Sequence, residues 1–199
     1  MLTARRLAGL IDAFDAAPWG AASGRRLPRG DFATPPPLYT QEERVRRDTS
    51  PWTMVQGVLA PLQFVVFLVS LGLVLRYLAT GEGFAEATTS VVIKTVVLYA
   101  IMITGCIWEK EVFGRWLFAP AFFWEDVVSM AVLALHTAYL AALFTGALSP
   151  RGQLLLALAA YATYVVNAAQ FVWKLRLARL DGQATAQTKA PQGAQEALG

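Results

Sequence analysis

The amino-acid sequence predicts an all-α integral membrane protein with four transmembrane helices and both termini in the cytoplasm. The 199-residue chain is 56% hydrophobic and only 16% charged, whereas a typical soluble domain carries about 25% charged residues. The apolar residues gather in four long runs, each with roughly the 20 residues that cross the hydrocarbon core as a helix. Most Lys and Arg residues lie outside these runs, as is typical of the segments that flank membrane spans.

The first segment, residues 1–50, has the composition of a mostly disordered cytoplasmic arm. It is rich in Arg, Gly, Ala and Pro and includes the run Pro35-Pro36-Pro37. The stretch RRLAGLIDAF near its start is a candidate for a short surface helix. Asp12 and Asp15 interrupt the apolar residues there, which does not fit a cleavable signal peptide.

The apolar runs form a transmembrane domain that we expect at residues 51–180, and they cover 52–77, 85–108, 122–147 and 152–173. The arm carries eight arginines, while the turns after the first and third runs carry one each, Arg76 and Arg151. This bias predicts that the arm, the link between the second and third runs and the C-terminus face the cytoplasm. The polar residues 181–199 lack aromatics and are predicted to form a disordered tail.

Composition and motifs exclude several classes of protein. The single cysteine, Cys106, rules out an internal disulfide and a cysteine-rich metal site. The pI of about 9.2 does not indicate nucleic-acid binding, because the basic residues flank the apolar runs. The sequence has no P-loop, GxGxxG, nucleophile elbow or HExxH motif.

The link between the second and third runs holds the most informative residues of the chain. It reads WEKEVFGRWLFAPAFFWED and combines seven aromatic rings with four acids, Glu109, Glu111, Glu125 and Asp126. Aromatic rings are common at a membrane surface, but carboxylates beside hydrocarbon are costly. This combination indicates a membrane-surface site for proton chemistry or for a flat, apolar ligand.

Polar residues also fall on one face of the third run. Glu125, Ser129, His136 and Tyr139 lie within about 40° of one line on a helix, and a helix surrounded by lipid would not tolerate such a face. Asp126 points about 100° away, towards the link. Its place in the first helical turn also has an ordinary explanation, because the helix dipole favours negative charge there.

Two further polar residues sit deep in the apolar runs, and each has a structural and a functional interpretation. Lys94 either snorkels outward, forms an ion pair or serves a function. His136, the only histidine, is either a hydrogen-bonded structural residue or an axial ligand to a metal held by a macrocycle. The two lie at similar predicted depths and are expected to face each other across the bundle.

The first and fourth runs carry polar residues at regular spacing. Gln56, Gln63, Ser70 and Tyr77 recur every seven residues, and Tyr161, Tyr164, Asn167 and Gln170 every three. Both sets are typical of hydrogen bonds between membrane helices. The second set is also suited to contact with the polar edges of a ligand.

Three long strings carry a resemblance to a known family: YTQEERVRRDTSPWTMVQGVLAPLQF, VLYAIMITGCIWEKEVFGRWLFAPAFFWEDVVSM and YATYVVNAAQF. Over residues 39–180 the chain closely resembles the 3-vinyl bacteriochlorophyllide (chlorophyllide) hydratases of bacteriochlorophyll synthesis. The resemblance implies that water adds across the C3 vinyl group of the pigment to give a 1-hydroxyethyl group. It implies no redox cofactor, and the magnesium belongs to the substrate.

The resemblance carries over no catalytic residue, so the roles are hypotheses drawn from the residues. Glu125 is the candidate acid, with Asp126 or Glu109 positioning or deprotonating the water. His136 binds the pigment magnesium or hydrogen-bonds the water. The candidate substrate-binding residues are Lys94, Trp108, Glu111, Arg115, Trp124, Ser129, Tyr164 and Asn167, and Lys94, Lys110 and Arg115 could pair with the pigment's propionate or with the acids.

The expected partners are the pigment and membrane lipid, in an inner (intracytoplasmic) bacterial membrane, with no nucleic acid. The sequence leaves open whether the chain also contacts a second copy of itself or neighbouring enzymes of the pathway. Two other functions stay open at this point. A non-catalytic pigment carrier or assembly factor predicts pigment binding without product, and a small transporter or structural subunit predicts no pigment binding.

Overall fold

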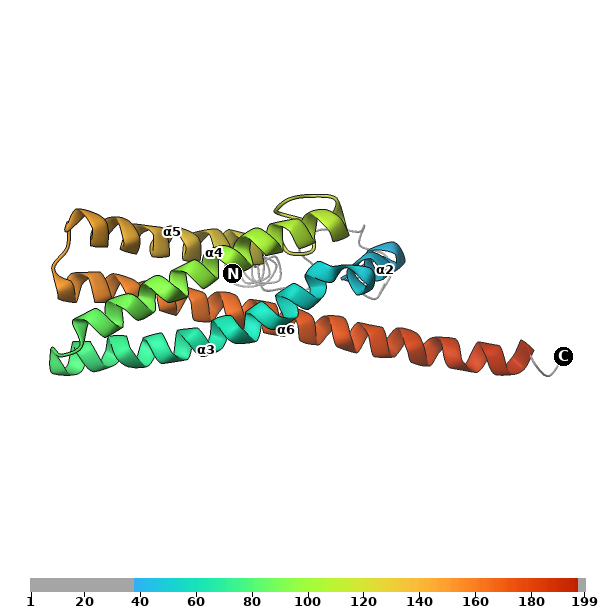
Figure 1. Cartoon of the computed structure of the whole chain (residues 1–199). Coiled ribbons are helices and arrows are strands. Elements are labelled where there is room, and N and C mark those ends of the chain that lie inside the picture. Colours follow the sequence, from blue (N-terminus) through green and yellow to red (C-terminus); the bar gives the residue numbers. More distant parts are fainter. Residues whose placement is uncertain (1–37, 197–199) are drawn as a thin grey trace, which may run out of the picture. The chain divides into compact units, whose positions relative to one another are not determined.

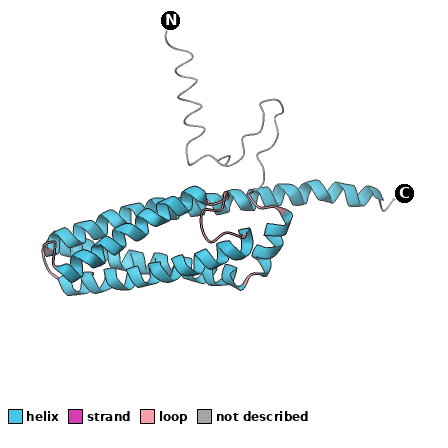
Figure 2. Cartoon of the chain, turned by 90° about the horizontal axis from the view of Figure 1, so that it is seen from above, coloured by secondary structure: helices cyan, strands magenta, loops and turns pink. Residues whose placement is uncertain are grey.

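The computed structural model describes residues 38–196, with side chains as far as residue 178, and this part of the chain is helical (Figure 1, Figure 2). Its helices are α2 (Gln41–Thr49), α3 (Pro51–Thr80), α4 (Phe84–Phe113), α5 (Phe123–Thr145) and α6 (Pro150–Glu196). Residues 41–169 form one compact unit. The predicted all-α class is confirmed for the described residues.

Four of the described helices are long and apolar enough to cross a membrane: α3, α4, α5 and the Pro150–Ala178 part of α6. They match the four predicted apolar runs: α3, α4 and α6 extend past their runs, whereas α5 is shorter than its run (122–147) at both ends. Ser50 caps the start of α3 by accepting a hydrogen bond from the Trp52 amide at 3.2 Å. Gly81, with a φ of 78°, ends the same helix, in a conformation that glycine adopts without strain.

Helix α2 lies within residues 1–50, the segment predicted to be a mostly disordered arm. Glu42 and Glu43 lie in its first turn and Arg46 and Arg47 in its last, so its charges oppose the helix dipole favourably. The helix packs against α3 and α4. The candidate helix RRLAGLIDAF and the rest of the arm lie outside the described residues.

The backbone of α6 continues as helix to Glu196, whereas composition predicted a disordered tail from residue 181. Ala and Gln favour helix, and extending an existing helix costs no new nucleation. The division of the chain into arm, membrane domain and tail stays a prediction.

The unit formed by residues 41–169 buries polar groups and exposes apolar ones. Met54, Ile103 and Phe144 are among its exposed side chains, as expected for helices surrounded by lipid. The buried polar and charged residues are Ser50, Gln63, Ser70, Lys94, Thr95, Glu109, Glu125, Asp126, Ser129, His136, Gln153 and Asn167. The polar chemistry of this unit therefore faces inward.

Side-chain hydrogen bonds join the spans at Gln56 and Ser70, as the regular spacing predicts, whereas the buried Gln63 side chain has no hydrogen-bond partner among the described residues. The Ser70 hydroxyl bonds to the hydroxyls of Ser90 at 2.7 Å and Tyr161 at 2.5 Å. The Gln56 amide donates to Thr104 at 2.8 Å. These bonds connect α3 to α4 and α6, in the way that small hydroxyls and amides join membrane helices.

Candidate functional site

The end of α4 and the start of α5 bring Glu109 and Asp126 together. Their side chains are buried, with exposed fractions of 4% and 7%, and lie within hydrogen-bonding reach of each other. A hydrogen bond between two carboxyl groups requires a proton on one of them. The arrangement therefore places two carboxyl groups side by side, where one shared proton would join them.

Backbone amides of the link between α4 and α5 donate hydrogen bonds to both acids of this pair. The Phe118 amide donates to Asp126 Oδ2 at 2.8 Å, and the Ala119 amide donates to Glu109 Oε1. Phe118 has a φ of 59°, a left-handed conformation that is unfavourable for a bulky residue. This turn points two successive N–H groups at the two acids, so the link orients the pair. The prediction that Asp126 points towards the link is confirmed.

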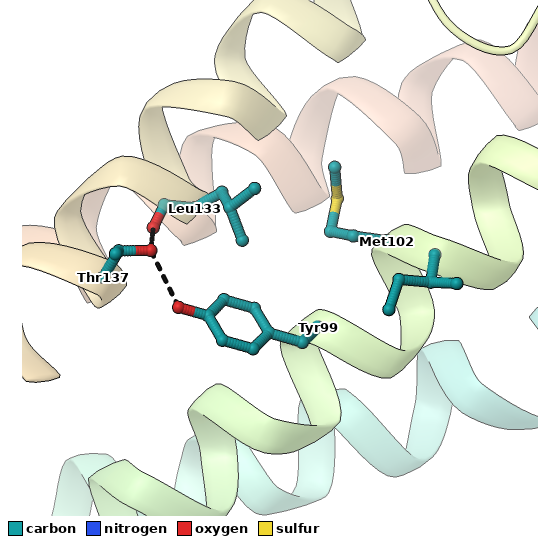
Figure 3. A pocket seen from close by; sticks show the side chains of 5 residues that line it. Tyr99, Met102, Leu133 and Thr137 are labelled. Atoms are coloured by element: carbon teal, nitrogen blue, oxygen red, sulfur yellow. Dashed lines mark hydrogen bonds between the residues drawn. The ribbon is translucent and has the colours of Figure 1, made fainter.

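A shallow apolar groove lies between α4 and α5 (Figure 3). Its volume is about 360 Å³, and it is lined by Tyr99, Met102 and Ile103 of α4 and by Leu133 and Thr137 of α5. The Tyr99 and Thr137 hydroxyls are hydrogen-bonded at 2.8 Å. None of these residues stands out in the sequence, because apolar side chains are ordinary in a membrane span and the groove arises only when α4 and α5 pack.

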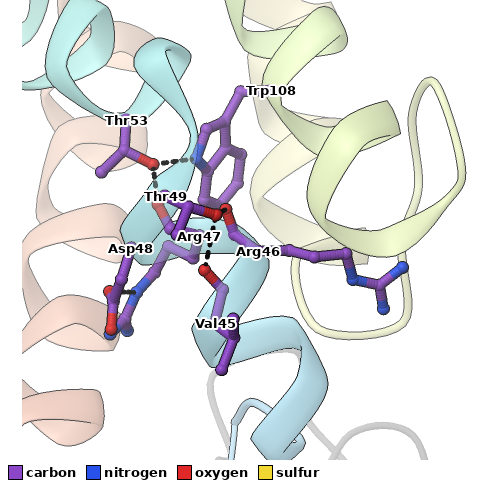
Figure 4. Close-up of polar contacts among 7 residues, drawn as sticks. All are labelled: Val45, Arg46, Arg47, Asp48, Thr49, Thr53 and Trp108. Atoms are coloured by element: carbon purple, nitrogen blue, oxygen red, sulfur yellow. Dashed lines mark hydrogen bonds and ion pairs between the residues drawn. The ribbon is translucent and has the colours of Figure 1, made fainter.

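Aromatic rings pack beside the acid pair. Trp108, Phe113 and Phe122 form a mutual cluster with ring centroids 5.7–5.8 Å apart in edge-on contacts, a favourable arrangement. The Trp108 indole also donates to Thr53 at 2.9 Å (Figure 4). The aromatic residues of the link therefore fix the ends of α3 and α4 against each other.

Glu125 is buried like its neighbour, but its surroundings differ. Asn167 donates from Nδ2 to the Glu125 carbonyl and to the Ser129 hydroxyl, each at 3.0 Å. The predicted shared face of α5 is confirmed, since Glu125, Ser129, His136 and Tyr139 are all buried. Among the described residues, no three Asp, Glu, His or Cys side chains form a group that could hold a metal ion.

Lys94 and His136 lie in the interior and interact electrostatically, as their depths predicted. Both are fully buried, so the snorkelling interpretation of Lys94 is wrong. Within the described part of the chain, Lys94 Nζ has no hydrogen-bond partner and sits 3.9 Å from the ring centroid of Tyr164. His136 Nδ1 pairs with the Val132 carbonyl at 2.8 Å, while Nε2 has no partner.

The other predicted substrate-binding residues are spread around the link. Glu111 lies at the surface and accepts a hydrogen bond from Ser50 at 2.7 Å. Arg115 is exposed. Lys110 donates to the Gly114 carbonyl at 2.9 Å. Trp124 is half-buried and its ring packs edge-on against Phe123. Their roles towards a substrate stay predictions.

Comparison with known proteins identifies relatives along most of the chain. The model of the 2-vinyl bacteriochlorophyllide hydratase family matches residues 39–177. The 2-vinyl bacteriochlorophyllide hydratase of Cereibacter sphaeroides is 70% identical over 148 residues, which cover 74% of this chain and 91% of the relative. The enzyme of the same name from Rhodobacter capsulatus is 68% identical over 143 residues, which cover 72% of this chain and 83% of the relative.

No solved structure matches the chain. The family match spans α2 to α5 and the membrane-crossing part of α6, including Glu109, Asp126 and the groove between α4 and α5. This chain belongs to the 2-vinyl bacteriochlorophyllide hydratase family.

Proposed function

We propose that this protein adds water to the ring vinyl group of a bacteriochlorophyllide or chlorophyllide and so forms a 1-hydroxyethyl pigment. The relatives are named for this reaction. We take positions 2 and 3 in the two forms of the name to be the same substituent, numbered by two conventions. The observation that carries the mechanism is the buried pair of Glu109 and Asp126, each held by a backbone N–H of the link.

The pair can supply both proton transfers of the reaction. Its shared proton moves to the terminal vinyl carbon, and the C=C π electrons form the new C–H bond. The cation left on the inner carbon is delocalised into the macrocycle and stabilised by the adjacent carboxylates. Water attacks this carbon and returns one proton to the pair. The net change is the addition of one water, and no oxidant or reductant takes part.

This mechanism changes the role first expected for Glu125. Glu109 and Asp126 are adjacent, buried and each held by a backbone N–H, so one of them can keep the proton that the reaction needs. Glu125 interacts electrostatically with Asp126. We therefore assign the proton transfers to the pair and assign Glu125 the electrostatic stabilisation of the cation.

His136 and Lys94 are proposed to hold the pigment. His136 Nδ1 donates its hydrogen to the Val132 carbonyl. The lone pair on Nε2 is therefore available to bind a magnesium ion or to accept a hydrogen bond from water. Lys94 has no counter-ion among the described residues, and the free carboxylate of a chlorophyllide would provide one. In this proposal magnesium arrives with the substrate, and the protein holds no cofactor of its own.

The four spanning helices make this a multi-pass membrane protein, and we propose the bacterial inner or intracytoplasmic membrane as its location. The excess of arginine in the arm supports cytoplasmic termini. This orientation places the acid pair at the cytoplasmic surface, where water is available. A C-terminal reporter that is active only in the cytoplasm tests the orientation.

The reaction itself is tested by incubating membranes that contain the protein with 3-vinyl bacteriochlorophyllide in water enriched in oxygen-18. The expected product has gained one labelled water, read by mass spectrometry of the pigment. Pigment that stays bound and unchanged would contradict the hydratase and favour a carrier. Pigment that neither binds nor changes would contradict both functions.

A further inference from the structure

The groove between α4 and α5 is aligned with the acid pair. Met102 precedes Glu109 by seven residues on α4, and Leu133 follows Asp126 by seven residues on the antiparallel α5. Seven residues return a helix to nearly the same face, with about 10 Å of rise. Both walls of the groove therefore lead along the same faces of the two helices to Glu109 and Asp126.

The space between the groove and the acids holds a small side chain. Cys106 lies between Met102 and Glu109 on α4, is half-buried and interacts electrostatically with both Glu109 and Asp126. Side chains on a helix lean towards its N-terminus. Because α4 ends at the acid pair, Glu109 leans towards the groove.

The lining of the groove indicates the chemistry of its occupant. Three of its five side chains are apolar, and its Tyr99–Thr137 hydrogen bond lies on the side away from the acids. The groove has a volume of about 360 Å³ and is open along one side, so a docked ring keeps one face towards the bilayer. Ile103 on its edge is exposed, so the groove opens on the outer, lipid-facing side of α4 and α5. A flat apolar ring dissolved in the bilayer fits this environment better than a water-soluble ligand does.

We propose that the α4–α5 groove is the docking site of the pigment macrocycle, which enters sideways from the bilayer with its vinyl edge towards Glu109 and Asp126. This inference rests on the proposed hydratase function. His136 and Lys94 are buried on the inward faces of α5 and α4, so the contacts proposed for them require the ring to pass between the two helices. The polar edge of the ring lies near the Tyr99–Thr137 hydrogen bond, at the end of the groove away from the acids.

The only cysteine of the chain gives a direct test. Membranes with the wild-type protein are treated with N-ethylmaleimide, with and without 3-vinyl bacteriochlorophyllide, and the alkylated fraction is read from the intact mass. Bound pigment should slow alkylation of Cys106 several-fold. In a Cys106→Ala background, Ile93→Cys provides the control, because Ile93 is exposed on α4 and does not line the groove. Pigment should leave its alkylation unchanged.

A second test fills the groove. Met102→Trp and Leu133→Trp should raise KM for the pigment several-fold, whereas Ile93→Trp, which adds the same ring elsewhere on α4, should not. Equal alkylation of Cys106 with and without bound pigment, or unchanged KM in both groove variants, would overturn the docking site while wild-type hydration still stands. A wild-type protein that forms no labelled product would instead overturn the hydratase function itself.

Discussion

Asp126 at the start of α5 and Glu109 near the end of α4 lie 17 residues apart in the chain and within hydrogen-bonding reach of each other. Each also accepts a backbone N–H, from the adjacent residues Phe118 and Ala119. Two buried carboxyl groups without such partners would be costly. The link between the helices therefore makes the pair tolerable and orients it.

The left-handed conformation of Phe118 should be measurable as strain. Phe118→Gly and Phe118→Ala both remove the ring and its contact with Phe123, but only glycine adopts a φ of 59° freely. We expect the glycine variant to be more stable than the alanine variant by about 1 kcal/mol. Thermal unfolding in detergent measures the difference. An alanine variant of equal or higher stability would mean that the turn is not strained.

Asn167 should stabilise the bundle through its two hydrogen bonds to α5. Asn167→Ala removes both bonds and should lower the free energy of unfolding by about 1 kcal/mol. Ser129→Ala removes only one of them and should cost less. Denaturant titration of the two variants checks the order. If Asn167→Ala unfolds like the wild type, the bonds to Glu125 and Ser129 do not contribute to stability.

Lys94 should lower the stability of the protein and strengthen binding of the pigment. Lys94→Met replaces a buried amine that lacks a hydrogen-bond partner within the described chain, so the free energy of unfolding should rise by about 1–3 kcal/mol. The variant should also show a higher KM for the free-acid pigment at unchanged kcat, and no such change for its methyl ester.

The matched control is Arg76→Gln, which removes a positive charge from the exposed end of α3 and should alter neither quantity. A destabilised Lys94→Met protein with unchanged KM would show that Lys94 has a purely structural role.

His136 should distinguish metallated from metal-free pigment. If Nε2 approaches the magnesium, His136→Ala should weaken binding of the magnesium pigment several-fold and leave the metal-free pigment little affected. Absorbance titrations of both pigments on the same protein provide the comparison. Equal loss for the two pigments would indicate that the ring of His136 only packs against Tyr161, its neighbour at 5.9 Å.

Much of the fold follows from the sequence because membrane helices are specified by length and hydrophobicity. The inward face of α5 was also predictable, since polar side chains at helical spacing cannot face lipid. Helix α2 was not predicted, because its polar composition is typical of disordered segments. Its charge pattern, with acids first and bases last, does favour a helix. For Lys94 the sequence left open snorkelling, an ion pair or a function, and its burial beneath the ring of Tyr164 excludes snorkelling.

The sequence predicts which segment holds the acid site but not which side chains of that segment lie together. Its four carboxylates stand out in the sequence, but the partner of each depends on the path of the link. The left-handed turn at Phe118, a residue that rarely adopts it, directs two amides to Asp126 and Glu109. The groove could not be predicted from the sequence for a related reason, because Met102 and Leu133 line one groove only after α4 and α5 pack.

The most direct test of the proposed acid pair is the single-turnover rate of pigment hydration in Glu109→Gln and Asp126→Asn, with Glu86→Gln as the control for loss of a carboxylate at the other end of α4. Each pair variant should retain pigment binding and lose about 10²–10⁴-fold in rate, while Glu125→Gln loses less and the control keeps the wild-type rate. Wild-type hydration by both pair variants, or a larger loss in Glu125→Gln than in either, would contradict the account.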